Sequence, residues 1–168
     1  NELKDYDEAI SDFNKALELN PRYALAYNNR GYAKNKLEDF YGAISDFSKA
    51  IEINPRYAMA YTNRGYAKNE LKDYHAAILD FNKAIEINPR YELAYYNRSR
   101  SYYFLEDYYQ AISDTTKTVE YNSQDKEAYA IRGMSKENIG DMKGACADWR
   151  KASELGHAAV AKWVRNQC

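Results

Sequence analysis

Arginine and aspartate recur together along the chain, and this pairing is the pattern most able to do chemistry. The arginines are Arg30, Arg64, Arg98 and Arg132, and the aspartates that follow each of them 16 residues later are Asp46, Asp80, Asp114 and Asp148. A planar guanidinium and a carboxylate form charge-assisted hydrogen bonds, often two at once. We therefore predict a ladder of salt bridges within the protein. The alternative is an arginine row that binds phosphate or carboxylate groups of a ligand.

Other reactive side chains are few and scattered. His75 and His157 are isolated and are expected at exposed positions, and the sequence has no Ser/His/Asp set, phosphate loop or Cys/His cluster. The two cysteines are too few for a disulfide framework and fit no metal motif. We expect Cys146 to fill the core and Cys168 to link two chains only by oxidation in air. The sequence predicts no enzyme, no metal site and no cofactor.

Composition excludes further classes of function. The chain has 24 Lys and Arg against 25 Asp and Glu, a net charge of −1. This balance offers no electrostatic footprint for nucleic acid or for an anionic membrane. No apolar run reaches the roughly 18 residues of a transmembrane helix, so membrane insertion is not expected. With few cysteines, a reduced, cytoplasmic location is the prediction.

An internal repeat organises the sequence. The letters NPRY begin at Asn20, Asn54 and Asn88, and NSQD begins at Asn122, each step being 34 residues. The tyrosine column keeps the same step: Tyr27, Tyr61, Tyr95 and Tyr129. A fixed period of this length indicates one structural unit stacked on copies of itself.

Each unit is predicted to contain two helices. Apolar residues recur at three- and four-residue steps over 24–37 and again over 40–53. An aspartate that can cap the second helix precedes it in each unit, as Asp5, Asp39, Asp73, Asp107 and Asp141. Asn-Pro ends the unit, because proline pushes the residue before it out of the helical region. We predict an all-α chain of antiparallel helix pairs.

The unit resembles the tetratricopeptide repeat. The resemblance rests on the 34-residue period, a small residue at Gly31, alanines at Ala43 and Ala50, the aromatic Phe47 and Pro55. It covers nearly the whole chain and implies a right-handed superhelical solenoid of helix pairs with a concave groove. For function it is less specific, because one fold hosts many activities.

The repeat frame predicts a single domain over residues 1–168. Residues 1–23 are a partial repeat, 24–57, 58–91, 92–125 and 126–159 are full repeats, and 160–168 form a C-terminal capping helix. Because the first unit lacks its front half, we expect an excised fragment of a longer protein with an exposed first face.

The family resemblance places the binding groove on the first helix of each unit. The candidate groove residues are Asn28, Asn29, Tyr32, Asn35, Thr62, Asn63, Tyr66, Asn69, Tyr96, Asn97, Arg100 and Tyr103. Asparagine amides can pair with the C=O and N–H of a peptide backbone, and tyrosines supply stiff contact area. The alternative is that the amides bond neighbouring repeats and the tyrosines pack between them.

A subset of the family clamps the C-terminal carboxylate of heat-shock chaperones. Asn63 matches the asparagine of that clamp, but Asn28, Tyr32, Leu93 and Asn97 stand where basic side chains are needed. A co-chaperone role of that type is therefore not expected.

The 92–125 repeat departs from the pattern. Ser99 replaces glycine, Thr115 replaces phenylalanine, Thr118 replaces alanine and Ser123 replaces proline. A buried hydroxyl must find a partner, often the backbone carbonyl four residues earlier. We expect the loosest helix pair here.

The sequence predicts a protein-interaction scaffold that receives a peptide or partner segment in its concave groove. One alternative is a scaffold that assembles head to tail with copies of itself through its terminal repeats. Another is a regulatory domain of a larger enzyme. The partner is expected to be another protein or peptide.

Overall fold

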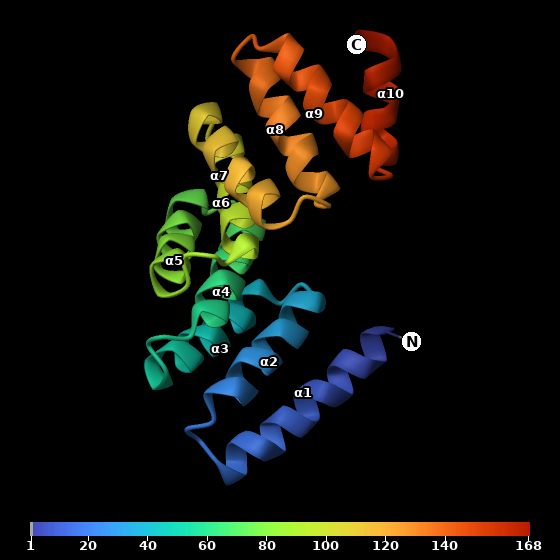
Figure 1. Ribbon diagram of the computed structural model, residues 1–168. Coiled ribbons are helices and arrows are strands. Elements are labelled where there is room, and N and C mark those ends of the chain that lie inside the picture. The colour runs from blue at the N-terminus through green and yellow to red at the C-terminus, as the bar shows by residue number, and fades with distance from the viewer. Residues whose placement is uncertain (1) are drawn as a thin grey trace. The chain divides into compact units, whose positions relative to one another are not determined.

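The computed structural model describes the backbone of residues 2–168 and the side chains of all of these except 2–4 and 166. In this part of the chain there are ten α-helices and no strand, which confirms the all-α prediction. The chain divides between Pro89 and Arg90 into two compact units. Figure 1 shows the helices of the first unit in blue to green and those of the second in yellow-green to red.

The helices of the first unit are α1 (Glu2–Leu19), α2 (Ala24–Lys36), α3 (Phe40–Ile53), α4 (Ala58–Glu70) and α5 (Tyr74–Ile87). Those of the second are α6 (Glu92–Phe104), α7 (Tyr108–Tyr121), α8 (Lys126–Asn138), α9 (Met142–Glu154) and α10 (Ala158–Gln167). Within each unit every helix packs on the next one along the chain, and the first helices also meet, α2 with α4 and α6 with α8.

Aspartate caps begin the second helix of each full repeat, as predicted. The carboxylates of Asp39, Asp73, Asp107 and Asp141 accept a hydrogen bond from the backbone N–H three residues later. Such caps satisfy one of the open donors of a helix start, worth about 1 kcal/mol each. Asp5 is an exception and corrects the prediction, because it lies inside α1, which already begins at Glu2.

The turn between repeats depends on asparagine more than on proline. The side-chain oxygens of Asn20, Asn54 and Asn122 each accept a hydrogen bond from the backbone N–H two residues later. This Asx turn stops the helix through the asparagine side chain itself. It explains why α7 still ends at Tyr121 although Ser123 replaces the proline of the other repeats.

A glycine facing an aromatic ring sets the distance between the two helices of a pair. A Cβ on Gly65 would lie 2.6 Å from Phe81, and one on Gly133 would lie 2.4 Å from Trp149. Both rings are buried, so neither has room to move away. The third repeat replaces both partners of this contact at once, with Ser99 and Thr115, and both of these are also fully buried.

The buried hydroxyls of the third repeat bond to the backbone, as predicted. Thr115 Oγ1 donates to the carbonyl of Ala111 at 2.6 Å, and Thr118 Oγ1 donates to that of Asp114 at 3.0 Å. Ser99 Oγ donates to the carbonyl of Tyr96 at 2.7 Å. Each hydroxyl is therefore satisfied within its own helix, which removes the cost of burying it. That this pair is the loosest stays a prediction.

Candidate functional site

The arginine and aspartate columns form the predicted ladder inside the helix pairs. Arg30 donates from Nε and Nη2 to the two carboxylate oxygens of Asp46, at 2.9 and 2.6 Å. The same two-pronged contact joins Arg64 to Asp80, Arg98 to Asp114 and Arg132 to Asp148. All four aspartates are buried. The prediction of salt bridges within each repeat is confirmed.

The remaining Nη1 donor of these arginines reaches the preceding repeat. Arg30 donates to Asn14 at 2.7 Å, Arg64 to Ser48 at 3.0 Å and Arg132 to Thr116 at 3.3 Å. Each of these guanidinium carbons also lies 5.2–5.6 Å from the ring centre of the tyrosine three residues earlier. Because Nε, Nη1 and Nη2 of these arginines all donate within the protein, the arginines hold repeats together, and the structure gives no support to a ligand-binding arginine row.

A lysine that we did not predict as part of the ladder completes it in three repeats. Lys34, Lys68 and Lys136 pair with the aspartate of their own repeat at 2.7–2.8 Å. The signal was available, because each lysine lies one helical turn after the arginine and so on the same face.

The third repeat has tyrosine at the lysine position. Tyr102 stands where the other repeats have lysine, and Arg98 is the one cation paired with Asp114 in the part of the chain described. Burial raises the pKa of the Asp114 carboxyl, and the hydrogen bond from Arg98 offsets that effect in part. The third repeat therefore neutralises its buried carboxylate with less positive charge than the other three.

Several amides of the predicted groove bond to each other. Asn63 Nδ2 donates to Asn28 Oδ1 at 3.0 Å, and Asn28 Nδ2 donates to Asn29 Oδ1 at 3.2 Å. Asn28 is only 2% exposed. This chain of amides joins α2 to α4, which corresponds to the alternative considered for the asparagine column. An amide used in this way has less capacity left for a peptide backbone.

Other predicted groove residues are covered. Thr62 is buried and donates to the carbonyl of Ala58, and Asn69 and Asn97 are buried as well. Asn97 Nδ2 donates to the carbonyl of Leu93. Asn35 is partly buried, and its Oδ1 is a buried acceptor without a partner in the described part of the chain.

An accessible surface does remain on α2 and α4, and we call it the α2–α4 surface. It contains Leu25, Asn29, Tyr32, Lys36, Met59 and Tyr66. Leu25 is 45% exposed, and Tyr32 and Met59 are each 46% exposed. The spacing of Leu25, Tyr32 and Lys36 along α2 puts them on one face of the helix, and Met59 Sδ lies 3.8 Å from Asn28 Nδ2. The surface combines apolar, aromatic and amide groups.

Lys36 gives this surface a cation held by tyrosines. Its Nζ lies 5.3 Å from the ring centre of Tyr32. The Tyr32 phenol, with smaller effects from Tyr6 and Tyr66, raises the pKa of Lys36. Among the described side chains no carboxylate forms an ion pair with Lys36, whereas Lys34 two residues earlier is paired. A carboxylate or carbonyl of a partner would complement it.

The second unit presents its own surface on α6. Tyr96, Arg100 and Tyr103 are partly exposed, and Leu93 and Phe104 beside them are more exposed. Tyr103 packs edge-on against Phe104 and Tyr108, with ring centres 5.9 and 5.8 Å apart. This surface is more aromatic than the α2–α4 surface.

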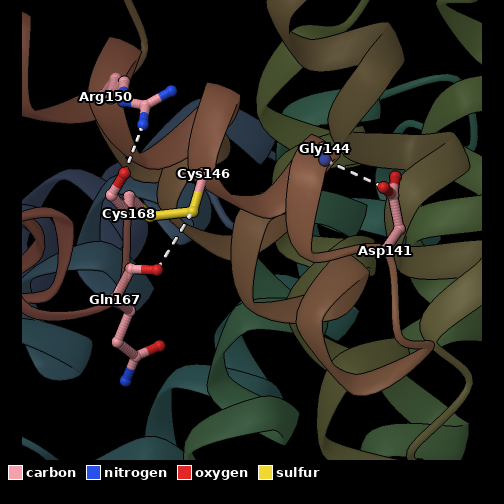
Figure 2. The surroundings of a disulfide bond; sticks show 6 residues. All are labelled: Asp141, Gly144, Cys146, Arg150, Gln167 and Cys168. Atoms are coloured by element: carbon pink, nitrogen blue, oxygen red, sulfur yellow. Dashed lines mark hydrogen bonds between the residues drawn. A yellow bond between two sulfur atoms is a disulfide. The ribbon is translucent and has the colours of Figure 1, made fainter.

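The interpretation of the cysteines was wrong for Cys168, although Cys146 does pack against the core between α8, α9 and α10 as expected. Cys146 on α9 and Cys168 form an intrachain disulfide, with Cα atoms 5.6 Å apart (Figure 2). Sequence spacing could not show this, because the two residues are 22 positions apart and meet only when α10 lies on α9. Disulfides persist in oxidising compartments, so this bond does not support the reasoning that led to a reduced, cytoplasmic location.

One of the two histidines also differs from the prediction. His75 is exposed, but His157 is partly buried and caps α10 by accepting from the backbone N–H of Val160 at 3.3 Å. Its Nε2 lies 3.2 Å from a carboxylate oxygen of Glu127 on α8.

The described residues also offer neither a metal-binding cluster nor a membrane-spanning helix. No group of three or more His, Cys, Asp or Glu side chains there could hold a metal ion. No helix among them is long and apolar enough to cross a membrane.

The chain belongs to the tetratricopeptide repeat family. The model described as "Tetratricopeptide repeat" matches residues 24–57 and 58–91, and the one described as "TPR repeat" matches residues 1–38. Together these matches cover residues 1–91, more than half of the 168 residues. No curated protein sequence matches the chain.

Solved structures of similar fold include MamA, YrrB and Spaghetti. A crystal structure of MamA is 25% identical, covers 94% of this chain and 92% of its own, and has a TM-score of 0.84. YrrB, titled a TPR protein with an unusual peptide-binding site, is 26% identical over 88% of this chain and 77% of its own (TM-score 0.78). The first TPR of Spaghetti (RPAP3), bound to HSP90 peptide SRMEEVD, is 25% identical over 70% and 93% (TM-score 0.69).

Proposed function

We propose that the chain is a protein-interaction scaffold that binds a peptide segment on the first helices of its repeats. One observation carries the proposal. On α2 and α4 the residues that build the fold are buried and paired with one another, while Leu25, Tyr32 and Met59 keep nearly half of their surface exposed. Exposed apolar and aromatic side chains gathered in one place indicate an interaction site.

The chemistry of the α2–α4 surface defines the segment that would fit it. Leu25 and Met59 suit an apolar side chain, and flexible methionine adapts to different shapes. Tyr32 and Lys36 supply donors for a carboxylate or a backbone carbonyl. We therefore propose an apolar residue next to an acceptor as the recognised element. Peptide binding by the similar proteins YrrB and Spaghetti supports this reading.

The proposal also includes both units in one repeat domain and assigns the chain no catalytic role. Of the residues predicted for the groove, Asn29, Tyr32 and Tyr66 are kept as the contacts of the first unit, and Tyr96, Arg100 and Tyr103 as those of the second. The bonded amides of Asn28 and Asn63 are assigned to the joint between α2 and α4.

The proposal predicts which substitutions weaken peptide binding on the α2–α4 surface. Peptides selected on the chain from a displayed random library should bind Tyr32→Ser and Met59→Ser each about tenfold more weakly, because truncating a contact residue costs about 1–2 kcal/mol. Fluorescence anisotropy with a labelled peptide measures the dissociation constants, and circular dichroism checks that the melting temperature is unchanged.

Tyr41→Ser is the matched control for this experiment. Tyr41 lies on α3 in the same unit and is 76% exposed, but it is not on a first helix. It should leave the dissociation constant unchanged. Equal losses for Tyr32 and Tyr41, or none for Tyr32 and Met59, would contradict the proposed site.

Association between copies is a second candidate function, favoured by a specific observation. In α3 and α5 the residues Ala43, Phe47, Ala77 and Phe81 are fully buried. Phe13 occupies the same column on α1 and is partly exposed, and Trp163 on α10 is 38% exposed. Helix α1 corresponds to the second helix of a repeat and exposes part of its inner face at Phe13. Helix α10 corresponds to the first helix of a repeat and exposes part of Trp163, so α1 and α10 are complementary halves of one repeat.

Association between copies predicts a mass that depends on protein concentration. The weight-average mass from light scattering should rise with protein concentration, because α1 of one copy can pack on α10 of another. Phe13→Ser should remove the rise by placing a hydroxyl on the apolar contact. A mass that stays at one chain over the whole concentration range excludes this candidate and leaves peptide binding untouched.

A further inference from the structure

A covalent bond fastens the end of α10 to α9. The disulfide joins Cys146, which is partly buried on α9, to Cys168, which is exposed (Figure 2). Beside it, Arg150 Nη2 donates to the carbonyl oxygen of Cys168 at 2.7 Å. Cys146 Sγ also lies 3.8 Å from the carbonyl oxygen of Gln167. Since a disulfide sulfur carries no hydrogen, we treat this approach as a packing contact.

The start of α10 is held by polar contacts of a different kind. His157 caps the helix and approaches Glu127, and Lys126 Nζ donates to the carbonyl of Gly156 at 3.5 Å. Helix α10 is therefore attached at both ends, by polar contacts to α8 at its first turn and by the disulfide to α9 at its last.

Between these two attachments the apolar burial of α10 comes from Val160 and, in part, from Val164. Val160 is its one fully buried side chain among those described, and it packs with Trp149 and the alanines at 130, 145 and 152. Trp163 meets Trp149 edge-on with ring centres 5.7 Å apart, but it stays partly exposed. A ten-residue helix is not stable alone in water. The helix therefore depends on its attachments to α8 and α9, and the crosslink is the one covalent attachment among those described.

We propose that the Cys146–Cys168 disulfide is a redox-controlled lock on α10. In oxidising surroundings the bond holds α10 on α9, with Val160 of α10 packed against Trp149. A dithiol reductant opens it by thiol–disulfide exchange. One reductant thiolate attacks the exposed Cys168 sulfur and releases the Cys146 thiolate, which takes up a proton. The second reductant thiol then resolves the mixed disulfide, leaving two cysteine thiols and an oxidised reductant.

Reduction changes α10 without removing the structure beneath it. Helices α8 and α9 keep their own pairing through Arg132 and Asp148 and through the contact between Gly133 and Trp149. In the unlocked state α8 and α9 therefore stay folded as a pair, while α10 detaches from them frequently. Trp149 is accessible to solvent during each detachment. The lock goes beyond the proposed peptide binding and does not depend on it.

Hydrogen exchange and tryptophan fluorescence test whether the disulfide locks α10. After reduction by dithiothreitol, amide hydrogen exchange in 158–167 should speed up about tenfold or more, while exchange in α8 and α9 stays the same, because local opening involves only the released helix. Tryptophan emission should shift to the red. The chain has two tryptophans, Trp149 and Trp163, and both lie at this contact, so the signal reports on it alone.

Cys168→Ser is the matched control, since it removes one exposed sulfur. It should exchange as fast as the reduced protein in either buffer and should not respond to dithiothreitol. Intact mass with thiol alkylation establishes whether the bond has formed. The proposal is overturned if air-oxidised protein keeps two free thiols, if α10 exchanges equally fast with and without the bond, or if α8 and α9 lose protection together with α10.

Discussion

Arg98→Ala is expected to lower the free energy of unfolding of the second unit by about 3–5 kcal/mol, because it leaves a buried carboxylate without a cation. Asp114 is 3% exposed, and in the described part of the chain Arg98 is its one charged partner. Arg64→Ala is expected to cost less, because Lys68 remains 2.7 Å from Asp80. Urea unfolding followed by circular dichroism measures both losses, and the fluorescence of Trp149 and Trp163 adds a signal that comes from the second unit alone.

The tyrosine at position 102 supplies the control for this comparison. Tyr102→Lys introduces the lysine that the other three repeats have, so it should recover about 1.5–3 kcal/mol in the Arg98→Ala background, the value of a hydrogen bond to a charged group. Equal losses of stability for Arg98→Ala and Arg64→Ala, together with no recovery from Tyr102→Lys, would show that the lysine does not stabilise the charge of the buried aspartate.

The second large effect is expected where a glycine meets an aromatic ring. Gly65→Ser should destabilise the first unit by about 2–3 kcal/mol, because its Cβ would overlap the Phe81 ring and overpacked cores cost this much. Phe81→Thr should cost about 3–5 kcal/mol by leaving a cavity. Circular dichroism in urea gives both values.

The double variant tests whether these two positions act as a pair. Gly65→Ser with Phe81→Thr reproduces the combination Ser99 and Thr115 of the third repeat, in which both side chains are fully buried. The added hydroxymethyl group then occupies space that the ring has left, so the double variant should lose less than the sum of the single losses by about 1–3 kcal/mol. Strict additivity would mean that the third repeat tolerates Ser99 for another reason.

The helices themselves could be predicted from the sequence because their signals are local. The asparagine turns, the aspartate caps and the apolar spacing act within a few residues, and each recurs at the same step, so an error in one repeat is corrected by the others. The one wrong cap prediction, Asp5, lies in the partial repeat 1–23, where the first helix of the unit is not there to fix the position of the second. The arginine ladder was predictable for the same reason, since two columns that keep step must meet in every repeat.

The accessible part of the candidate site could not be separated from the structural part in this way. Asn28 and Asn29 are adjacent on α2 and Asn63 lies on α4. These three residues have the same side chain, and their uses differ because Met59 and Asn63 of α4 approach Asn28 of α2. The sequence does not show that Leu25 and Met59 keep nearly half of their surface exposed while Thr62 is buried. Whether a side chain is buried depends on the first helix of the next repeat, 34 residues away in sequence. The repeat pattern alone does not show how that helix packs.

The sequence by itself determined a chain of paired helices, their limits, and the arginine and aspartate contacts that join each pair, because these follow from short-range geometry repeated at a constant period. Only the tertiary structure decided which amides are already bonded, which apolar side chains face outward, and that Cys146 and Cys168 meet. Those outcomes depend on how one helix lies on another, and that placement is set by the sum of many weak packing contacts and not by any single motif.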